Sequence, residues 1–229
     1  MDGGLKTLKF ILIGDSGVGK SSLTYRLCDN LFLVDHAPTI GLDFKYTTLD
    51  MDDGTRVKLQ VWDTAGQDTF LSLTTAYYRG SQAAIVCFDL TNRLTYEHLD
   101  DWYQRIRDHS DHEKPIPCIL VGCKSDLANE QTISLRQVGS PEAMEWAEKH
   151  GFMYMETSAK TAENVQEVFQ YMAAVVLSGS TDPSTHTRGG LKTLPGQRKK
   201  PAKALGGGML SGPAPAPGVE KPTKKGCSC

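Results

Sequence analysis

The stretch GDSGVGKS, residues 14–21, determines the fold that the rest of the chain must adopt. It matches the pattern G-x-x-x-x-G-K-[ST] and lies between an apolar run at 8–14 and a helix-like stretch at 20–29. Its glycines let the backbone wrap closely, so that successive N–H groups point at an anion, and the helix adds its positive N-terminal end. The sequence therefore predicts a strand, a phosphate-binding loop and a helix in succession.

Two side chains of this loop add their own chemistry. Lys20 places a compact positive charge against the outer phosphates, and the Ser21 hydroxyl is a ligand for Mg²⁺. A glycine-rich turn that matches the pattern by chance is the alternative interpretation. The strand and the helix on either side favour the phosphate-binding loop.

Apolar strand-like runs alternate with helix-like stretches along the chain. Further strands are predicted at 57–63, 83–89, 116–122 and 152–157, and further helices at 92–109, 140–150 and 162–177. The segment 43–63 is typical of a hairpin that turns at Asp53-Gly54. This alternation predicts an α/β fold, with a mostly parallel six-stranded sheet, one antiparallel edge strand (43–50) and helices on both faces. Ligands of such sheets bind at the carboxyl ends of the strands.

The C-terminal part of the chain has a different composition. Residues 179–229 contain nine Lys or Arg against two Asp or Glu, and 7 of the 11 prolines. Residues 1–178 carry 16 basic and 25 acidic side chains. A segment with so few large apolar residues buries too little surface to offset its conformational entropy. We expect one folded domain over 1–178 and a disordered, basic, Pro- and Gly-rich tail over 179–229.

The motif WDTAGQ (62–67) ends another predicted strand. Asp63 is placed to hold Mg²⁺ through water, the Gly66 N–H to contact a terminal phosphate, and Gln67 to orient an attacking water. Such a sequence is usually a turn when it occurs alone, but downstream of a phosphate loop it indicates a metal and phosphate site. Thr39 in APTIG reaches the metal on the same condition, because a Pro-Thr pair is otherwise a turn.

The motif VGCKSD (121–126) follows the strand predicted at 116–122 and suggests a grip on a purine ring. Asp126 can accept hydrogen bonds from the ring N–H and the exocyclic amine of guanine, whereas adenine would leave a buried carboxylate unpaired. Lys124 can pack its stem over the purine face. The Ala159 N–H, within ETSAK, can donate to the guanine oxygen. A solvated Lys-Asp pair is the alternative for this motif taken alone.

Together these motifs resemble those of the small GTPases of the Ras superfamily. The resemblance covers about residues 5–178, with five separate motifs in order at compatible spacing. The segments IGLDF (40–44), KLQVWDTAGQ (58–67), YYRGS (77–81) and CFDLT (87–91) are similar to segments around the two switches of the Rab branch. The resemblance implies the P-loop NTPase fold of small GTPases. It also implies GTP and GDP as ligands, Mg²⁺ as cofactor, and slow hydrolysis of GTP to GDP and phosphate by a switch that regulates vesicle and membrane traffic.

The resemblance also assigns site residues on this chain. Switch I would span about 32–44 and switch II about 63–80. Gln67 would be the catalytic residue that positions water, and Phe32 would pack edge-on against guanine. Mg²⁺ would be bound by Ser21, Thr39 and Asp63. The nucleotide would contact Ser16, Gly17, Val18, Gly19, Lys20, Ser21, Ser22, Phe32, Thr39, Gly66, Cys123, Lys124, Asp126, Ser158, Ala159 and Lys160.

Two positions depart from the family pattern. The family usually has Asn where this chain has Cys123, and that Asn contacts guanine and ties the base loop to the phosphate loop. A thiol is a weak donor and acceptor, so nucleotide affinity is expected to fall about tenfold to a hundredfold. In GQDTF (66–70), Asp68 and Thr69 stand where Rabs typically have Glu and Arg. This second change bears on recognition by regulators more than on chemistry.

Two functions other than a GTPase switch are open from the sequence. A prenylated adaptor would hold nucleotide with weak or no GTPase cycling, because Cys123 loosens the site. An ATP-using P-loop kinase is disfavoured, since Asp126 and Ala159 select against adenine. The nucleotide that co-purifies with the protein discriminates among the three.

The chain ends in CSC, which resembles the Rab signal for two geranylgeranyl groups, here on Cys227 and Cys229. Two lipid chains bind a membrane stably where one binds marginally, and nearby Lys residues add attraction to anionic leaflets. A tail that is merely kept soluble by its charges is the alternative. No apolar stretch is long enough to span a bilayer, so we expect a lipid-anchored protein on the cytosolic face of an intracellular membrane, cycling with the cytosol.

The resemblance implies several protein partners and no nucleic acid. They are an exchange factor, a GTPase-activating protein, a GDP-dissociation inhibitor or escort protein, and effectors. The ordered, GTP-bound form of the two switches would bind the effectors.

Overall fold

The structure is a computed structural model that describes residues 5–34, 39, 42–64, 78–109, 116–129 and 134–179. All of these lie in one of the two compact units of the chain, residues 1–191. No helix within these ranges is long and apolar enough to cross a membrane. The expected division into a folded domain over 1–178 and a tail over 179–229 stays a prediction.

Six strands form one sheet in the order β2-β3-β1-β4-β5-β6. Their bounds are β1 Thr7–Ile13, β2 Leu42–Asp50, β3 Arg56–Thr64, β4 Ala83–Asp89, β5 Cys118–Cys123 and β6 Met153–Glu156. β2 pairs antiparallel with β3, and the other neighbouring pairs are parallel. The expected mostly parallel sheet with one antiparallel edge strand is confirmed.

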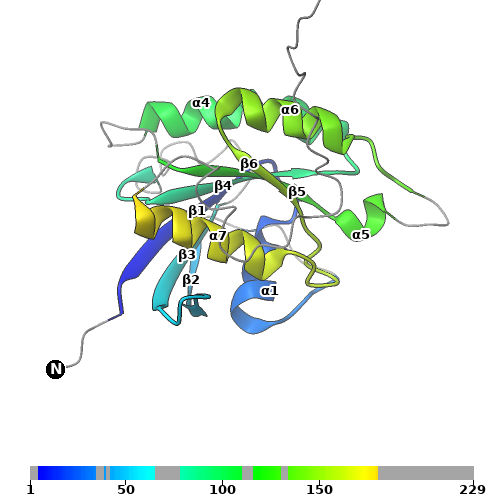
Figure 1. The fold of residues 1–229 in the computed structure, drawn as a ribbon. Coiled ribbons are helices and arrows are strands. Elements are labelled where there is room, and N and C mark those ends of the chain that lie inside the picture. Colours follow the sequence, from blue (N-terminus) through cyan, green and yellow to red (C-terminus); the bar gives the residue numbers. More distant parts are fainter. Residues whose placement is uncertain are drawn as a thin grey trace, which may run out of the picture. The chain divides into compact units, whose positions relative to one another are not determined.

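Helices lie on both faces of this sheet (Figure 1). Their bounds are α1 Lys20–Asp29, α3 Arg93–Glu97, α4 Leu99–His109, α5 Ser125–Ala128, α6 Ser140–His150 and α7 Val165–Ser178. Figure 1 shows α4 and α6 on one face and α1 and α7 on the other. Strands covered on both sides read as continuous apolar runs, and β4 and β5 are buried at every residue. A hydrophobic cluster around Phe88, Trp102 and Tyr154 fills the space beneath α4 and α6.

The predicted hairpin is confirmed at its turn. The Gly54 N–H donates to the Met51 carbonyl at 2.9 Å, and the Met51 N–H donates to the Thr55 carbonyl at 2.8 Å. Gly54 has φ 80°, a left-handed conformation that a residue without Cβ adopts at little cost. The turn sets the register of β2 and β3, in which Asp50 faces Arg56.

The helix predicted at 92–109 is two helices, and His98 stands between them. Its backbone, at φ −83° and ψ 0°, leaves the helical region, and its N–H donates to carbonyls of the preceding turn. The hydrophobic period continues across this joint, so periodicity alone could not place it. The sequence also missed α5, because four residues are too short to show a helical period.

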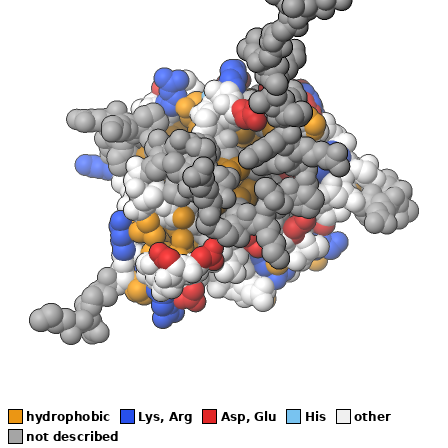
Figure 2. Space-filling view, viewed as in Figure 1, with side chains coloured by type: hydrophobic (Ala, Val, Ile, Leu, Met, Phe, Trp, Pro, Cys, Tyr) orange, Lys and Arg blue, Asp and Glu red, His pale blue; other side chains and the backbone are white. Residues whose placement is uncertain are grey.

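The surface carries both signs of charge. On the face shown in Figure 2, basic and acidic side chains both lie around the rim, with hydrophobic side chains between them. The whole chain has a formal net charge of −2.

Candidate functional site

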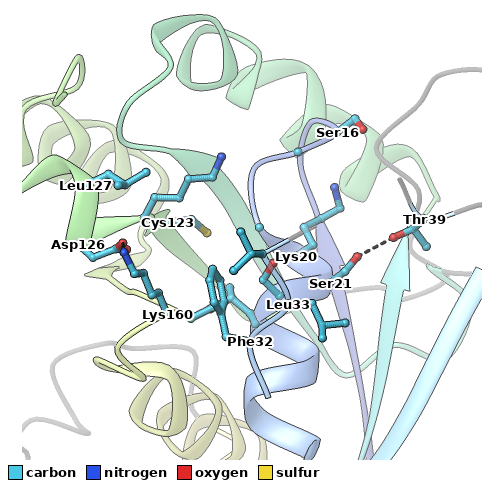
Figure 3. A pocket seen from close by; sticks show the side chains of 17 residues that line it. Ser16, Lys20, Ser21, Phe32, Leu33, Thr39, Cys123, Asp126, Leu127 and Lys160 are labelled. Carbon is cyan, nitrogen blue, oxygen red and sulfur yellow. Dashed lines mark hydrogen bonds and ion pairs between the residues drawn. The ribbon is translucent and has the colours of Figure 1, made fainter. Parts of the chain in front are cut away.

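A cavity of about 330 Å³ opens beside α1, where the loops that follow β1, β5 and β6 meet. This volume is typical of a small-molecule site. In Figure 3, Lys20, Ser21 and Thr39 lie toward one end of the cavity and Asp126 and Lys160 toward the other. The lining residues are Ser16, Gly17, Gly19, Lys20, Ser21, Ser22, Leu23, Phe32, Leu33, Val34, Thr39, Cys123, Lys124, Asp126, Leu127, Ala159 and Lys160.

The phosphate loop approaches β4 too closely for any side chain at its first residue. A Cβ at Gly14 would lie 2.1 Å from the Cys87 carbonyl oxygen, and φ at Gly14 is 137°. The loop folds around Lys20, whose Nζ donates to the carbonyls of Gly14 and Asp15, each at 2.8 Å. Burial lowers the pKa of Lys20 by penalising its charge. A bound anion would offset that penalty, which is what a phosphate site requires.

Three oxygen-bearing side chains meet beside the phosphate loop. The hydroxyls of Ser21 and Thr39 are 2.6 Å apart, and the Thr39 hydroxyl lies 3.5 Å from Oδ2 of Asp63. Asp63 is buried at the end of β3. Two hydroxyls and a carboxylate are hard donors of the kind that Mg²⁺ prefers. The donor set therefore fits the metal that the sequence implied.

At the opposite end of the cavity, the carboxylate of Asp126 is held by two neighbouring side chains. The Ser158 hydroxyl donates to Asp126 Oδ1 at 2.7 Å, and Lys160 Nζ lies 3.9 Å from the other oxygen. Ser158 is fully buried and does not line the cavity, so it orients Asp126 rather than facing a ligand. Asp126 and Ala159 both line the cavity, as the reading of a guanine pocket requires.

Lys124 has a partner that the sequence analysis missed. Its Nζ lies 2.7 Å from Oδ2 of Asp89, a buried residue at the end of β4. This ion pair holds the Lys124 side chain along one wall of the cavity. The sequence does show an acidic residue, Asp89, at the end of a predicted strand. Pairing it with Lys124 requires knowing that β4 lies next to β5, which the sequence alone does not give.

Arg26 was also missed, and it joins α1 to the loop after β6. Its Nε donates to the Ala159 carbonyl at 2.7 Å, and Nη2 donates to the Lys160 carbonyl at 3.2 Å. Nη1 bonds the carbonyl and the side chain of Asn30 at the end of α1. The carbonyl of Ala159 therefore points at Arg26, on the helix that carries the phosphate loop.

Cys123 lies between the two ends of the cavity (Figure 3). Its Sγ is 3.8 Å from the position that a Cβ on Gly19 would take, so the thiol faces the phosphate loop. The pKa of Cys87 is raised well above its ordinary value, first by its interaction with the Cys123 thiol and then by burial. Both thiols are buried, and Cys123 is 3% exposed.

A buried hydroxyl stands beside Cys123. The Thr157 N–H donates to the Gly122 carbonyl and its carbonyl accepts from Ser125, so Thr157 continues β6 alongside Cys123. Thr157 is fully buried, and its Oγ1 has no hydrogen-bond partner among the residues described. A buried hydroxyl without a partner costs about 1–3 kcal/mol.

Most of the predicted site residues line the cavity, and the exceptions fall into two groups. Val18, Ser158 and Asp63 are buried outside the lining, and Oδ2 of Asp63 lies 3.5 Å from the hydroxyl of Thr39, which is part of it. Gly66, Gln67, Cys227 and Cys229 lie outside the described residues. The sequence analysis also missed apolar lining residues, namely Leu23, Leu33, Val34 and Leu127.

Comparison with known proteins yields a family and close relatives. The model of the Ras family matches residues 9–178. Over 161 residues the chain is 45% identical to Ras-related protein Rab11A of Lotus japonicus, covering 70% of this chain and 68% of that protein. Over 178 residues it is 40% identical to Ras-related protein RABE1e of Arabidopsis thaliana, covering 78% of each.

Proposed function

We propose that this chain, which belongs to the Ras family and is a Rab-type small GTPase, hydrolyses GTP in the cavity described above with the help of Mg²⁺. Rab-type GTPases are enzymes of membrane traffic, and the reaction yields GDP and phosphate. One observation carries this proposal. A buried cation, Lys20, and an oriented carboxylate, Asp126, stand at opposite ends of a single cavity. That spacing suits a ligand with phosphates at one end and guanine at the other.

Each end of the cavity has a defined task in this proposal. Lys20 and the loop N–H groups bind the outer phosphates, and Asp126 with the Ala159 N–H selects guanine. Ser21, Thr39 and Asp63 hold Mg²⁺, which supplies charge neutralisation at the phosphates when bound. The contact between Ser21 and Thr39 supports a direct link from the phosphate loop to switch I. Gln67, outside the described residues, orients the attacking water.

The nucleotide bound to the purified protein tests this function. We expect one equivalent of GDP or GTP per chain when the full-length protein is denatured and the released nucleotide is identified by chromatography. A protein that elutes empty would instead favour the adaptor, whose site Cys123 has loosened. Released ADP or ATP would favour the kinase.

Removing the Ser21 hydroxyl is expected to speed GDP release at least about tenfold, because Mg²⁺ loses a direct ligand. Chelation of Mg²⁺ should accelerate release from the wild-type protein and add little to the Ser21→Ala variant. The measurement is the rate of loss of labelled GDP, with and without chelator.

Ser178→Ala is the matched control for that experiment, since it removes a hydroxyl at the end of α7, away from the cavity. It should behave as the wild type does. Equal acceleration by the chelator in Ser21→Ala and in the wild type would exclude Ser21 as a metal ligand.

We also propose the cellular part of this function from the C-terminal sequence. Cys227 and Cys229 carry geranylgeranyl groups, and the basic tail adds attraction to an anionic membrane surface. The protein then cycles between an intracellular membrane and the cytosol. An exchange factor, an activating protein, a GDP-dissociation inhibitor or escort protein and effectors act on it in turn.

A further inference from the structure

The carboxylate of Asp15, the second residue of the phosphate loop, is held by two donors from far along the chain. Nδ1 of His98 lies 2.7 Å from Oδ2, and Nε1 of Trp102 donates to Oδ1 at 2.7 Å. His98 stands at the joint between α3 and α4, and Trp102 follows one turn later on α4. This spacing of four residues lets both rings reach the same carboxylate.

Asp15 is also bonded through its main chain to the phosphate-binding lysine. Nζ of Lys20 donates to the Asp15 carbonyl at 2.8 Å. The two ring donors fix the side chain of the residue whose carbonyl orients Lys20. Asp15 therefore connects His98 to Lys20, the cation at the phosphate end of the cavity.

The charge of Asp15 opposes the proposed ligand. A carboxylate on the phosphate loop repels phosphate, and a protonated imidazole 2.7 Å away offsets that repulsion. The hydrogen bond and the charge of Asp15 raise the pKa of His98 above its ordinary 6.5, with Asp101 on α4 and Glu97 on α3 adding to the shift. His98 is charged below its raised pKa and neutral above it, so the compensation is present in acid and is lost as the pH rises.

We propose that His98 is a positioning residue for the phosphate loop, and that its protonation makes the retention of guanine nucleotide depend on pH. The proposal rests on the GTPase site described above and adds that pH regulates how long this site retains nucleotide. The charged ring holds Asp15 and cancels its charge, so nucleotide is retained longest at low pH. The neutral ring still donates one N–H to Asp15 but no longer cancels its charge.

The test compares GDP release from the full-length protein and its His98→Gln variant at pH 6 and pH 9. Glutamine keeps a hydrogen-bond donor but never carries the charge. The side chain of His98 is 51% exposed, so solvent screens its charge and the expected effect is modest. At pH 6 the variant should release GDP about threefold faster than the wild type. At pH 9 the two rates should converge.

Two further variants separate charge from simple loss of contact. His150→Gln is the matched control, because His150 also neighbours an aspartate, Asp100 at 3.7 Å, but on α6, away from the phosphate loop. It should leave the ratio of rates at the two pH values unchanged. Trp102→Phe removes one donor to Asp15 and should speed release at both pH values while keeping the pH dependence.

The outcomes distinguish this proposal from the function on which it rests. A wild-type protein that binds no guanine nucleotide at either pH would contradict the GTPase site itself. A protein that binds GDP stoichiometrically, with the same His98→Gln to wild-type ratio at pH 6 and pH 9, would leave that site intact and overturn the role of His98.

Discussion

Replacing Asp126 by Asn is expected to lower the affinity for GDP about a thousandfold and to turn the preference toward xanthosine diphosphate. Guanine offers two donors, its ring N–H and its amine, and a carboxylate accepts both. The amide has one acceptor and one donor, so one guanine donor would face an N–H group. A lost charge-assisted hydrogen bond and an unpaired donor together cost about 4 kcal/mol. Xanthine, with a carbonyl in place of the amine, matches the amide.

Competition binding with the two diphosphates measures this change in preference. Asp52→Asn, the same change on an exposed residue of the β2–β3 turn, is the control and should not alter either affinity. Thermal unfolding of both variants checks that the fold is intact. An Asp126→Asn protein that still prefers GDP would show that another residue reads the base.

Replacing Cys123 by Asn is expected to slow GDP release about tenfold or more. The amide would face the phosphate loop, as the thiol does beside Gly19, and would supply a partner for the Thr157 hydroxyl. Satisfying a buried hydroxyl and adding a hydrogen bond across the two loops would both stabilise the bound form. Release of labelled GDP from full-length protein is the measurement.

The Thr157 hydroxyl provides an internal control for that result. Thr157→Val should change release from the wild-type protein little, because the hydroxyl has no partner there among the described residues. The same change should cancel part of the gain in the Cys123→Asn background, and the difference is the coupling between the two side chains. Unchanged release in Cys123→Asn would mean that the thiol already suffices. If Cys123→Asn slowed GDP release equally with and without the Thr157 hydroxyl, the Asn side chain would act through a group other than Thr157.

On this expectation, the residue at position 123 sets how firmly the two ends of the cavity are joined. In this chain the connection between them runs instead through Arg26, which ties α1 to the loop carrying Ala159. The ion pair of Lys124 with Asp89 holds a different segment, the loop that follows β5, against the end of β4.

Much of the fold followed from local sequence. The bounds of α1 and α6 were predicted to the residue, because each begins and ends at a local signal: the phosphate loop, a proline near the start, and Asn30 or Gly151 in a left-handed cap. The joint at His98 was missed because a break in backbone geometry need not interrupt a hydrophobic period.

The sequence by itself determined most of the elements, the phosphate loop and the residue types that are expected to face phosphate, metal and base. These depend on backbone conformation, side-chain chemistry and spacing within one segment, which are local properties. Only the tertiary structure decided which distant groups hold them. The donors to Asp15 come from residues 83 and 87 positions away, and the partner of Ala159 from 133 positions away. Such pairs depend on strand order and helix placement, which bring remote segments together without leaving any regular spacing in the chain.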